Sequence, residues 1–301
     1  MNITPSSSRA LTRALVLAGA GAAGNAWQLG LIAGLSAHSL ELTEADLIVG
    51  TSAGSTVAAQ ITSGTPSSEL YAAIVAEPAR PAPGRTPPAT RPALSGPDYM
   101  AWSDAIIAAS ADAADMRRRI GAAALERDSS EGADAARWRS IVSARLPRHA
   151  WPEQRVLIPA VDARTGEPVV FDRHSGIDLV DAVAASTSAM TPYRIGEDRY
   201  LNGGYRRSSN ADLAEGFSRV LILEPFGGRS RQPLAWGMDL ATQVEELRAS
   251  GSVVETVFPD AGAGDVFNAN ALDPSTRLPA ARGGYAQGQA LAESLRGFWC
   301  A

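Results

Sequence analysis

The feature that most constrains this chain is an apolar run that passes directly into a serine flanked by glycines. Residues 47–49 are Leu-Ile-Val, and residues 50–54 are Gly-Thr-Ser-Ala-Gly, which fits the pattern G-x-S-x-G after a strand. Gly50 and Gly54 allow a sharp turn that lifts Ser52 above a sheet, at the N-terminus of a following helix. Free amides and the helix dipole favour a developing negative charge there. The pattern makes Ser52 a candidate nucleophile, and an N-capping serine in an ordinary turn is the alternative.

A second glycine-rich segment lies upstream, after the apolar run at residues 14–18. Residues 19–24 are Gly-Ala-Gly-Ala-Ala-Gly and fit G-x-G-x-x-G, the pattern of a dinucleotide-binding loop. That interpretation requires an acidic residue at the end of the second strand, where residues 48–52 read Ile-Val-Gly-Thr-Ser. A structural glycine turn is a further alternative. The interpretation we favour is an oxyanion hole, built from the backbone amides of Gly19, Ala20, Gly21 and Ala22.

The composition excludes several other classes. The formal net charge is −5, and because the chain has no lysine, its 27 basic residues are all arginines, scattered among the acids. This pattern is not typical of nucleic-acid binding. The single cysteine, Cys300, can form neither an internal disulfide nor a thiolate metal site. We expect a cytoplasmic protein without a metal or an organic cofactor.

Residues 14–37 carry no charge and follow Arg9 and Arg13, a pattern that superficially suggests a membrane helix or a signal peptide. Five glycines, together with polar Asn25 and Gln28, favour a strand, a loop and an amphipathic helix instead. We therefore expect peripheral membrane contact at most.

The rest of the chain predicts one α/β domain over residues 1–301. Strands are expected at residues 14–18, 45–49, 155–163, 168–172, 199–201 and 219–223. Helices are expected at residues 25–39, 55–75 with a break at residues 64–66, 99–126, 135–146, 180–189 and 285–298. Residues 78–97 are dense in Pro, Ala, Gly and Arg, which indicates a surface excursion. Residues from about 78 to 135 are therefore expected to be a flexible linker and a helical cap inserted between core strands.

The two glycine motifs, followed by Asn202-Gly203-Gly204, resemble the patatin-like phospholipase family. Ala26-Trp27 after the glycine loop is most similar to the bacterial branch of that family. The resemblance extends to residues 159–166, 181–186 and 210–214, and it omits the insertion at 78–135. It implies a three-layer α/β/α sandwich of patatin type with a central, mostly parallel sheet.

The resemblance also implies a catalytic dyad of serine and aspartate without histidine. Ser52 matches the nucleophile, whereas Asn202 stands at the position of the aspartate. The three histidines are expected to be surface or turn residues, and all precede the last part of the chain: His38, His149 and His174. Asp198 lies roughly 13 Å away along a short strand, and Asp212 lies in a structural segment. Neither is a good substitute for the base.

Asn202 leaves more than one function open for the chain. A carboxamide can hydrogen-bond Ser52 but cannot take its proton, and replacing the aspartate of a serine-protease triad by asparagine costs on the order of 10⁴ in turnover. Three interpretations are open: a deliberate substitution, a natural enzyme with altered chemistry, and a natural non-catalytic acyl-binding protein. The parent activity is expected to be acyl hydrolysis or transfer from a carboxylic ester through acyl-Ser52. A lipid, a small ester and a carrier-bound acyl thioester all suit it, and the oligomeric state is open.

Overall fold

The protein is described by a computed structural model that covers residues 12–78, 95–129 and 132–300. An eight-stranded sheet runs through its centre in the order β5-β6-β3-β2-β1-β7-β8, and β4 pairs with β3. Its strands are β1 Arg13–Leu17, β2 Leu47–Gly50, β3 Arg155–Asp162, β4 Pro168–Phe171, β5 Tyr193–Ile195, β6 Asp198–Asn202, β7 Arg219–Leu223 and β8 Val253–Val257.

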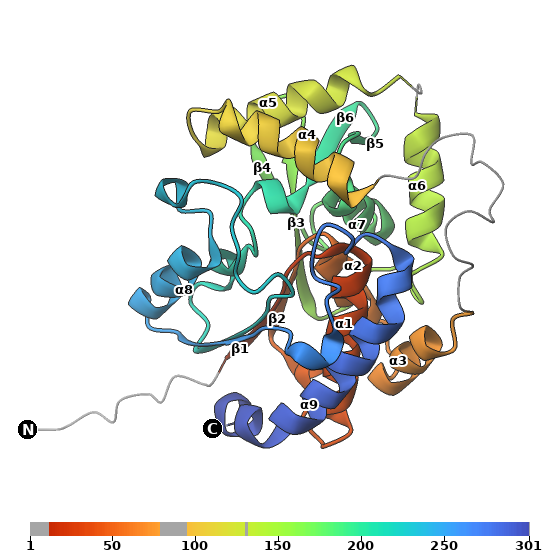
Figure 1. Ribbon diagram of the computed structural model, residues 1–301, viewed down its shortest axis with the longest axis vertical. Coiled ribbons are helices and arrows are strands. Elements are labelled where there is room, and N and C mark those ends of the chain that lie inside the picture. The colour runs from red at the N-terminus through yellow and green to blue at the C-terminus, as the bar shows by residue number, and fades with distance from the viewer. Residues whose placement is uncertain (1–11, 79–94, 130–131, 301) are drawn as a thin grey trace, which may run out of the picture.

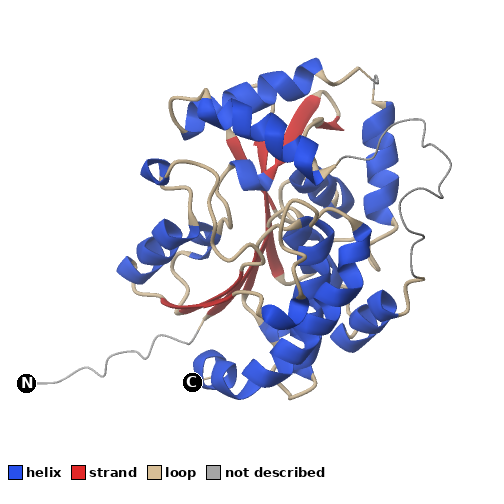
Figure 2. Ribbon diagram, viewed as in Figure 1, coloured by secondary structure: helices blue, strands red, loops and turns tan. Residues whose placement is uncertain are grey.

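The five strands from β3 to β8 in this order are parallel, and the pairings β3-β4, β3-β6 and β5-β6 are antiparallel. Helices cover both faces of the sheet, which confirms the predicted α/β/α architecture (Figures 1 and 2). One face packs against α1 Gly21–Ser36, α2 Ala53–Ile61, α3 Ser67–Val75, α7 Leu179–Thr187 and α9 Arg277–Trp299. The other face packs against α8 Leu240–Ala249 and a short 3-10 helix, η3 Ala211–Ala214.

The described helices of the segment predicted to be an insertion are α4 Gly96–Ala108 and α5 Ala113–Glu126, and they lie at one end of the sheet (Figure 1). The next helix, α6 Ala133–Ser143, packs on α7, where Trp138 Nε1 donates to Ala184 O at 3.2 Å. Apolar side chains of α4 and α5 form a small core with Leu201 and Tyr205. Because these two residues flank the turn at 202–204, α4 and α5 border the segment that carries Asn202.

The boundaries differ from the sequence expectation at several places. The single helix predicted over 99–126 is wrong: the chain breaks at 109–112, where the Asp112 carboxylate caps α5 by accepting a hydrogen bond from Asp115 N at 2.7 Å. The helix expected from residue 25 begins at Gly21. Three elements of the structure, β5, α8 and β8, were not predicted. Most of the excursion predicted at 78–97 lies outside the described residues.

The uncharged stretch at 14–37 forms β1, a glycine loop and α1. In the described part of the chain, no helix combines the length and apolar character needed to cross a membrane.

Candidate functional site

Ser52 connects β2 to α2 in a sharply turned backbone. Its φ is 52° and its ψ is −121°, and it is one of three described non-glycine residues with positive φ. The flanking glycines are required by close packing: a Cβ on Gly54 would lie 2.0 Å from the carbonyl oxygen of Leu17, and one on Gly50 would lie 2.7 Å from Gly54 O. The start of α2 can therefore pack closely against the end of β1. Ser52, which is partly exposed, lies at this edge of the sheet.

The glycine loop lies directly against this serine. A Cβ on Gly19 would come within 2.8 Å of Ser52 Cβ and 3.4 Å of its Oγ. Ala23 N donates to Ala271 O at 3.0 Å, and Gly24 N donates to Ala20 O at 2.9 Å. The four preceding amides, of residues 19–22, donate to no acceptor among the described residues. The loop thus brings unpaired donors and the N-terminus of α1 to Ser52.

Asn202 is the last residue of β6, and its side chain contacts Ser52. Asn202 Nδ2 donates to Ser52 Oγ at 2.9 Å, and Gly204 N donates to Asn202 Oδ1 at 2.9 Å. The second contact fixes the orientation of the carboxamide, because only the carbonyl oxygen can accept from a backbone amide. The amide nitrogen therefore faces the serine, so at this contact the hydroxyl oxygen accepts a hydrogen bond.

Ser186 and Ser188, to which the sequence analysis assigned no role, hold the pair in place. Ser52 N donates to Ser186 Oγ at 3.0 Å, and Asn202 N donates to Ser188 O at 2.7 Å. The end of α7 thereby links the two halves of the site. Ser186 lies in a segment that contributes to the family resemblance, but no local pattern indicates that its hydroxyl reaches an amide 134 positions away.

The other candidates are engaged elsewhere. Asp198 pairs with Arg164, and Asp212 pairs with Arg206 at 2.7 Å. All three histidines are exposed, and the imidazole of His149 contacts Ser143 Oγ at 3.1 Å. His38 and His174 make backbone contacts: His38 O accepts from Arg296, and His174 N donates to the Asp172 carboxylate. Their expected placement at the surface is confirmed. No cluster of three or more metal-ligating side chains occurs in the described ranges.

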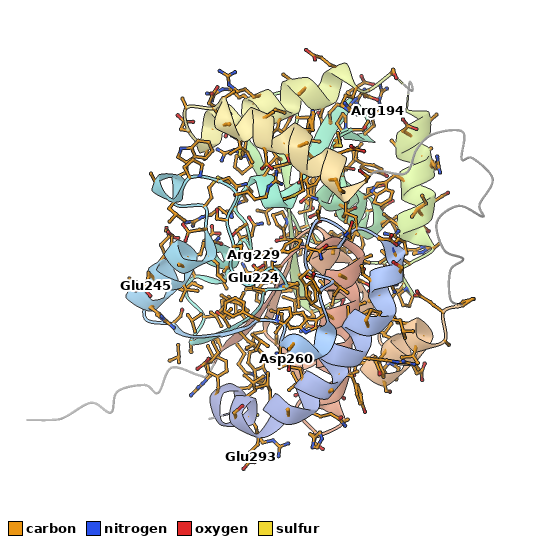
Figure 3. All side chains as sticks on the ribbon, viewed as in Figure 1. Arg194, Glu224, Arg229, Glu245, Asp260 and Glu293 are labelled. Carbon is orange, nitrogen blue, oxygen red and sulfur yellow. The ribbon has the colours of Figure 1, made fainter. Side chains whose placement is uncertain are left out.

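A buried carboxyl group lies behind the site, at the carboxyl end of β7. Glu224 is 5% exposed and accepts hydrogen bonds from Ser209 Oγ and, at 3.2 Å, from Phe226 N. Figure 3 places it in the interior, whereas Glu245 and Glu293 lie at the periphery. Burial, which exceeds the effect of the two hydrogen bonds, raises the pKa of Glu224 to about 7. The local sequence around Glu224 did not indicate this environment.

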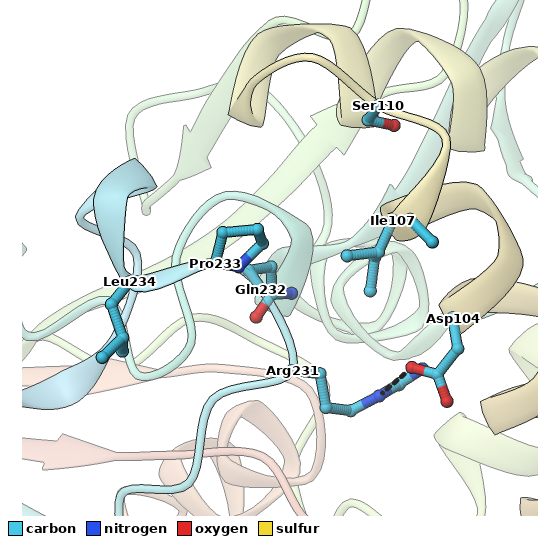
Figure 4. Close-up of a pocket in the computed structure, with 8 residues that line it drawn as sticks. Asp104, Ile107, Ser110, Arg231, Gln232, Pro233 and Leu234 are labelled. Atoms are coloured by element: carbon cyan, nitrogen blue, oxygen red, sulfur yellow. Dashed lines mark hydrogen bonds and ion pairs between the residues drawn. The ribbon is translucent and has the colours of Figure 1, made fainter.

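The segment between β8 and α9 covers part of the glycine loop. Besides the bond from Ala23 N to Ala271 O, the Leu272 side chain occupies the space that a Cβ on Gly21 would need. A separate pocket lies between α4 and residues 231–234, where Arg231 binds the Asp104 carboxylate (Figure 4). Neither Ser52 nor Asn202 lines that pocket.

Comparison with known proteins gives one family match. A family model described as patatin-like phospholipase matches residues 15–215. The structure of VipD from Legionella pneumophila is 12% identical, covers 94% of this chain and 67% of its own length, and has a TM-score of 0.40. The type III effector protein ExoU is 17% identical and covers 93% of this chain and 54% of its own length, with a TM-score of 0.35. No curated protein sequence matches.

Proposed function

Because the chain belongs to the patatin-like phospholipase family, we propose that it is a serine acyl hydrolase or acyltransferase that acts on the carboxylic esters of lipids. The observation that carries the proposal is the convergence at Ser52 of a glycine loop with unpaired amides and the side chain of residue 202, 2.9 Å from Oγ. These are the nucleophile, the oxyanion donors and the position of the base. The Ala26-Trp27 pair supports a place in the bacterial branch.

In the proposed reaction, Ser52 Oγ bonds to the carbonyl carbon of the ester, and the negative charge that develops on the carbonyl oxygen is stabilised by amides of residues 19–22. The proton that Ser52 Oγ loses is passed to the alcohol oxygen, and the alcohol leaves as the carbon–oxygen bond breaks. Water releases the acid from acyl-Ser52 in a hydrolase, whereas a second alcohol takes the acyl group in a transferase. A carrier-bound thioester would donate its acyl group by the same steps.

Asn202 sets the rate of these steps. An aspartate here would keep the hydrogen bond from Gly204 N on one oxygen and accept the Ser52 proton on the other. The amide nitrogen of Asn202 instead donates to Ser52 Oγ, so it leaves the hydroxyl proton without a base at this contact. We propose that the geometry of the dyad persists while its basicity is lost, whether the asparagine is a deliberate substitution or the natural residue.

We predict that Asn202→Asp increases kcat for a short-chain p-nitrophenyl ester by on the order of 10⁴, the effect of the equivalent exchange in a serine triad. Release of p-nitrophenol measures the rate. Ser52→Ala in the same background is the matched control and should abolish the gain.

A folded Asn202→Asp variant that remains inactive, and whose Ser52 ignores a fluorophosphonate probe, would contradict the hydrolase proposal. That outcome would support the second candidate, a non-catalytic acyl-binding protein. The donation from Asn202 Nδ2 to Ser52 Oγ favours this candidate, because it makes the serine an acceptor rather than an activated nucleophile.

A further inference from the structure

Asn210 lies beneath the site and is completely buried. Its φ of 56° places it in the left-handed region, in which asparagine is better tolerated than most other residues. It precedes the 3-10 helix η3 and lies eight positions after Asn202. Because a fully buried carboxamide must be hydrogen-bonded to be tolerated, its contacts identify what it holds.

The side chain of Asn210 joins the two halves of the site. Its Nδ2 lies 3.0 Å from Thr51 Oγ1 and 3.0 Å from Gly203 O, and it also lies 3.1 Å from Arg207 O. Its Oδ1 accepts from Arg206 Nη1 at 2.9 Å. Thr51 immediately precedes the nucleophile, and Gly203 immediately follows residue 202. The carboxamide therefore bridges the chain next to each partner of the Ser52–Asn202 contact.

We propose that Asn210 is a positioning residue that sets the distance between Ser52 Oγ and the side chain of residue 202, an inference that rests on the function proposed for Ser52. The turn at Gly203 is confined from two sides: Asn210 holds its carbonyl oxygen, and a Cβ on Gly203 would lie 2.3 Å from Pro159 O. With β3 on one side and Asn210 on the other, residue 202 has little freedom to withdraw from the serine.

The chemistry of the contacts requires asparagine. Nδ2 faces one hydroxyl oxygen and two carbonyl oxygens, whereas Oδ1 faces the Arg206 guanidinium. An aspartate has the same shape and tolerates the left-handed backbone, but it would direct an acceptor at those carbonyl oxygens. Asn210→Asp thus removes the donor while it preserves volume, and Asn210→Gly removes the side chain while it preserves the backbone conformation.

The control is Gln243→Glu. Gln243 is also completely buried and holds the same segment, since its Oε1 accepts from Ala211 N at 2.7 Å and its Nε2 donates to Met238 O at 3.0 Å. Neither Thr51 nor Gly203 is among the hydrogen-bond partners of Gln243. A purely structural role for this segment would make the two exchanges equivalent.

The test has two readouts. Crystal structures of the unmodified chain and of Asn210→Asp compare the distance from Ser52 Oγ to Asn202 Nδ2, which we expect to exceed hydrogen-bond reach in the variant only. Steady-state kinetics in the Asn202→Asp background should show kcat lower by about 100-fold for both Asn210 variants, with KM within about 3-fold. Gln243→Glu should retain kcat within about 3-fold even where its melting temperature falls.

An unchanged Ser52–Asn202 distance in Asn210→Asp, or equal kcat losses in Asn210→Asp and Gln243→Glu, would overturn the proposal. If Asn210→Asp does not fold, Asn210→Gly and Thr51→Val, which removes one acceptor of the bridge, are read against the same criteria. A folded Asn202→Asp variant that is inactive and whose Ser52 also ignores the fluorophosphonate probe would refute the proposed function, whereas the crystallographic distance would still decide the role of Asn210.

Discussion

At the scale of single residues, Ser52 depends on partners from several elements that are distant in the sequence. Its turned backbone leaves its amide pointing at α7, where Ser186 Oγ accepts the hydrogen bond at 3.0 Å. Ser186 is completely buried, so its hydroxyl is shielded from solvent. A donor that loses its acceptor away from solvent costs about 1–3 kcal/mol.

Ser186→Ala should therefore lower the free energy of unfolding by about 1–3 kcal/mol and slow the reaction of Ser52 with a fluorophosphonate in the Asn202→Asp background. Urea denaturation and the labelling rate measure the two effects. Ser188→Ala is the matched control, because Ser188 follows the end of α7 and its Oγ donates back to Ala184 O of that helix rather than to Ser52 or Asn202. Its unfolding free energy should change by no more than about 0.5 kcal/mol, because Ala184 O keeps its hydrogen bonds from Trp138 Nε1 and Thr187 Oγ1. Similar losses in both variants would contradict a specific role for Ser186.

At the scale of elements, the glycine loop is supported by the close packing of α1 on α9. A Cβ on Gly30 would lie 2.2 Å from Ala281 O, and one on Gly284 would lie 2.3 Å from Trp27 O. Glycines thus allow the two helix backbones to approach each other. Since α1 begins at Gly21, its seating against α9 also determines where the free amides of residues 19–22 lie relative to Ser52.

We predict that Gly30→Ala destabilises the protein by about 1–3 kcal/mol, the usual effect of overpacking. Gly297→Ala in α9 makes the same exchange where a Cβ would meet nothing within 4 Å. It should stabilise the protein by up to about 1 kcal/mol, because alanine is the better helix former. Thermal and urea unfolding compare the two. If Gly30→Ala stabilised the protein instead, the close packing of α1 on α9 would not be needed for stability.

At the scale of the whole molecule, Glu224 makes stability depend on pH. Its pKa is about 7 in the folded protein, against 4.5 for an ordinary glutamate. Between these values the unfolded chain is ionised while the folded protein keeps its proton. The contribution of Glu224 to stability therefore falls as pH rises from 4.5 to 7 and is constant above that range.

Glu224→Gln removes this titration and keeps an acceptor for Phe226 N. The unfolding free energy of the variant relative to the unmodified protein should rise by about 3 kcal/mol between pH 4.5 and 7, at 1.36 kcal/mol per pKa unit. Urea unfolding of both proteins at a series of pH values measures this difference. The contributions of other groups with shifted pKa values cancel in it, because both proteins contain those groups. A difference independent of pH would mean that Glu224 is ionised in the folded protein.

Sequence patterns were sufficient wherever a local period or turn decides the structure. The strands beside Ser52 and the hairpin of β3 and β4 follow from short apolar runs with turn residues between them. The break between α4 and α5 was missed because residues 99–126 are helix formers on either side of the cap at Asp112. The strand β8 was missed because its burial depends on its neighbour β7.

The sequence by itself determined the fold class and the choice of Ser52, because these follow from local periods and from residues that only certain turns accept. The family and the choice of Asn202 came from a resemblance carried by several motifs together. Only the tertiary structure decided that the carboxamide of Asn202 donates to Ser52, that Ser186 and Asn210 hold the pair, and that Glu224 is buried behind it. The physical reason is distance along the chain. Hydrogen bonds between groups up to 159 positions apart leave no local pattern.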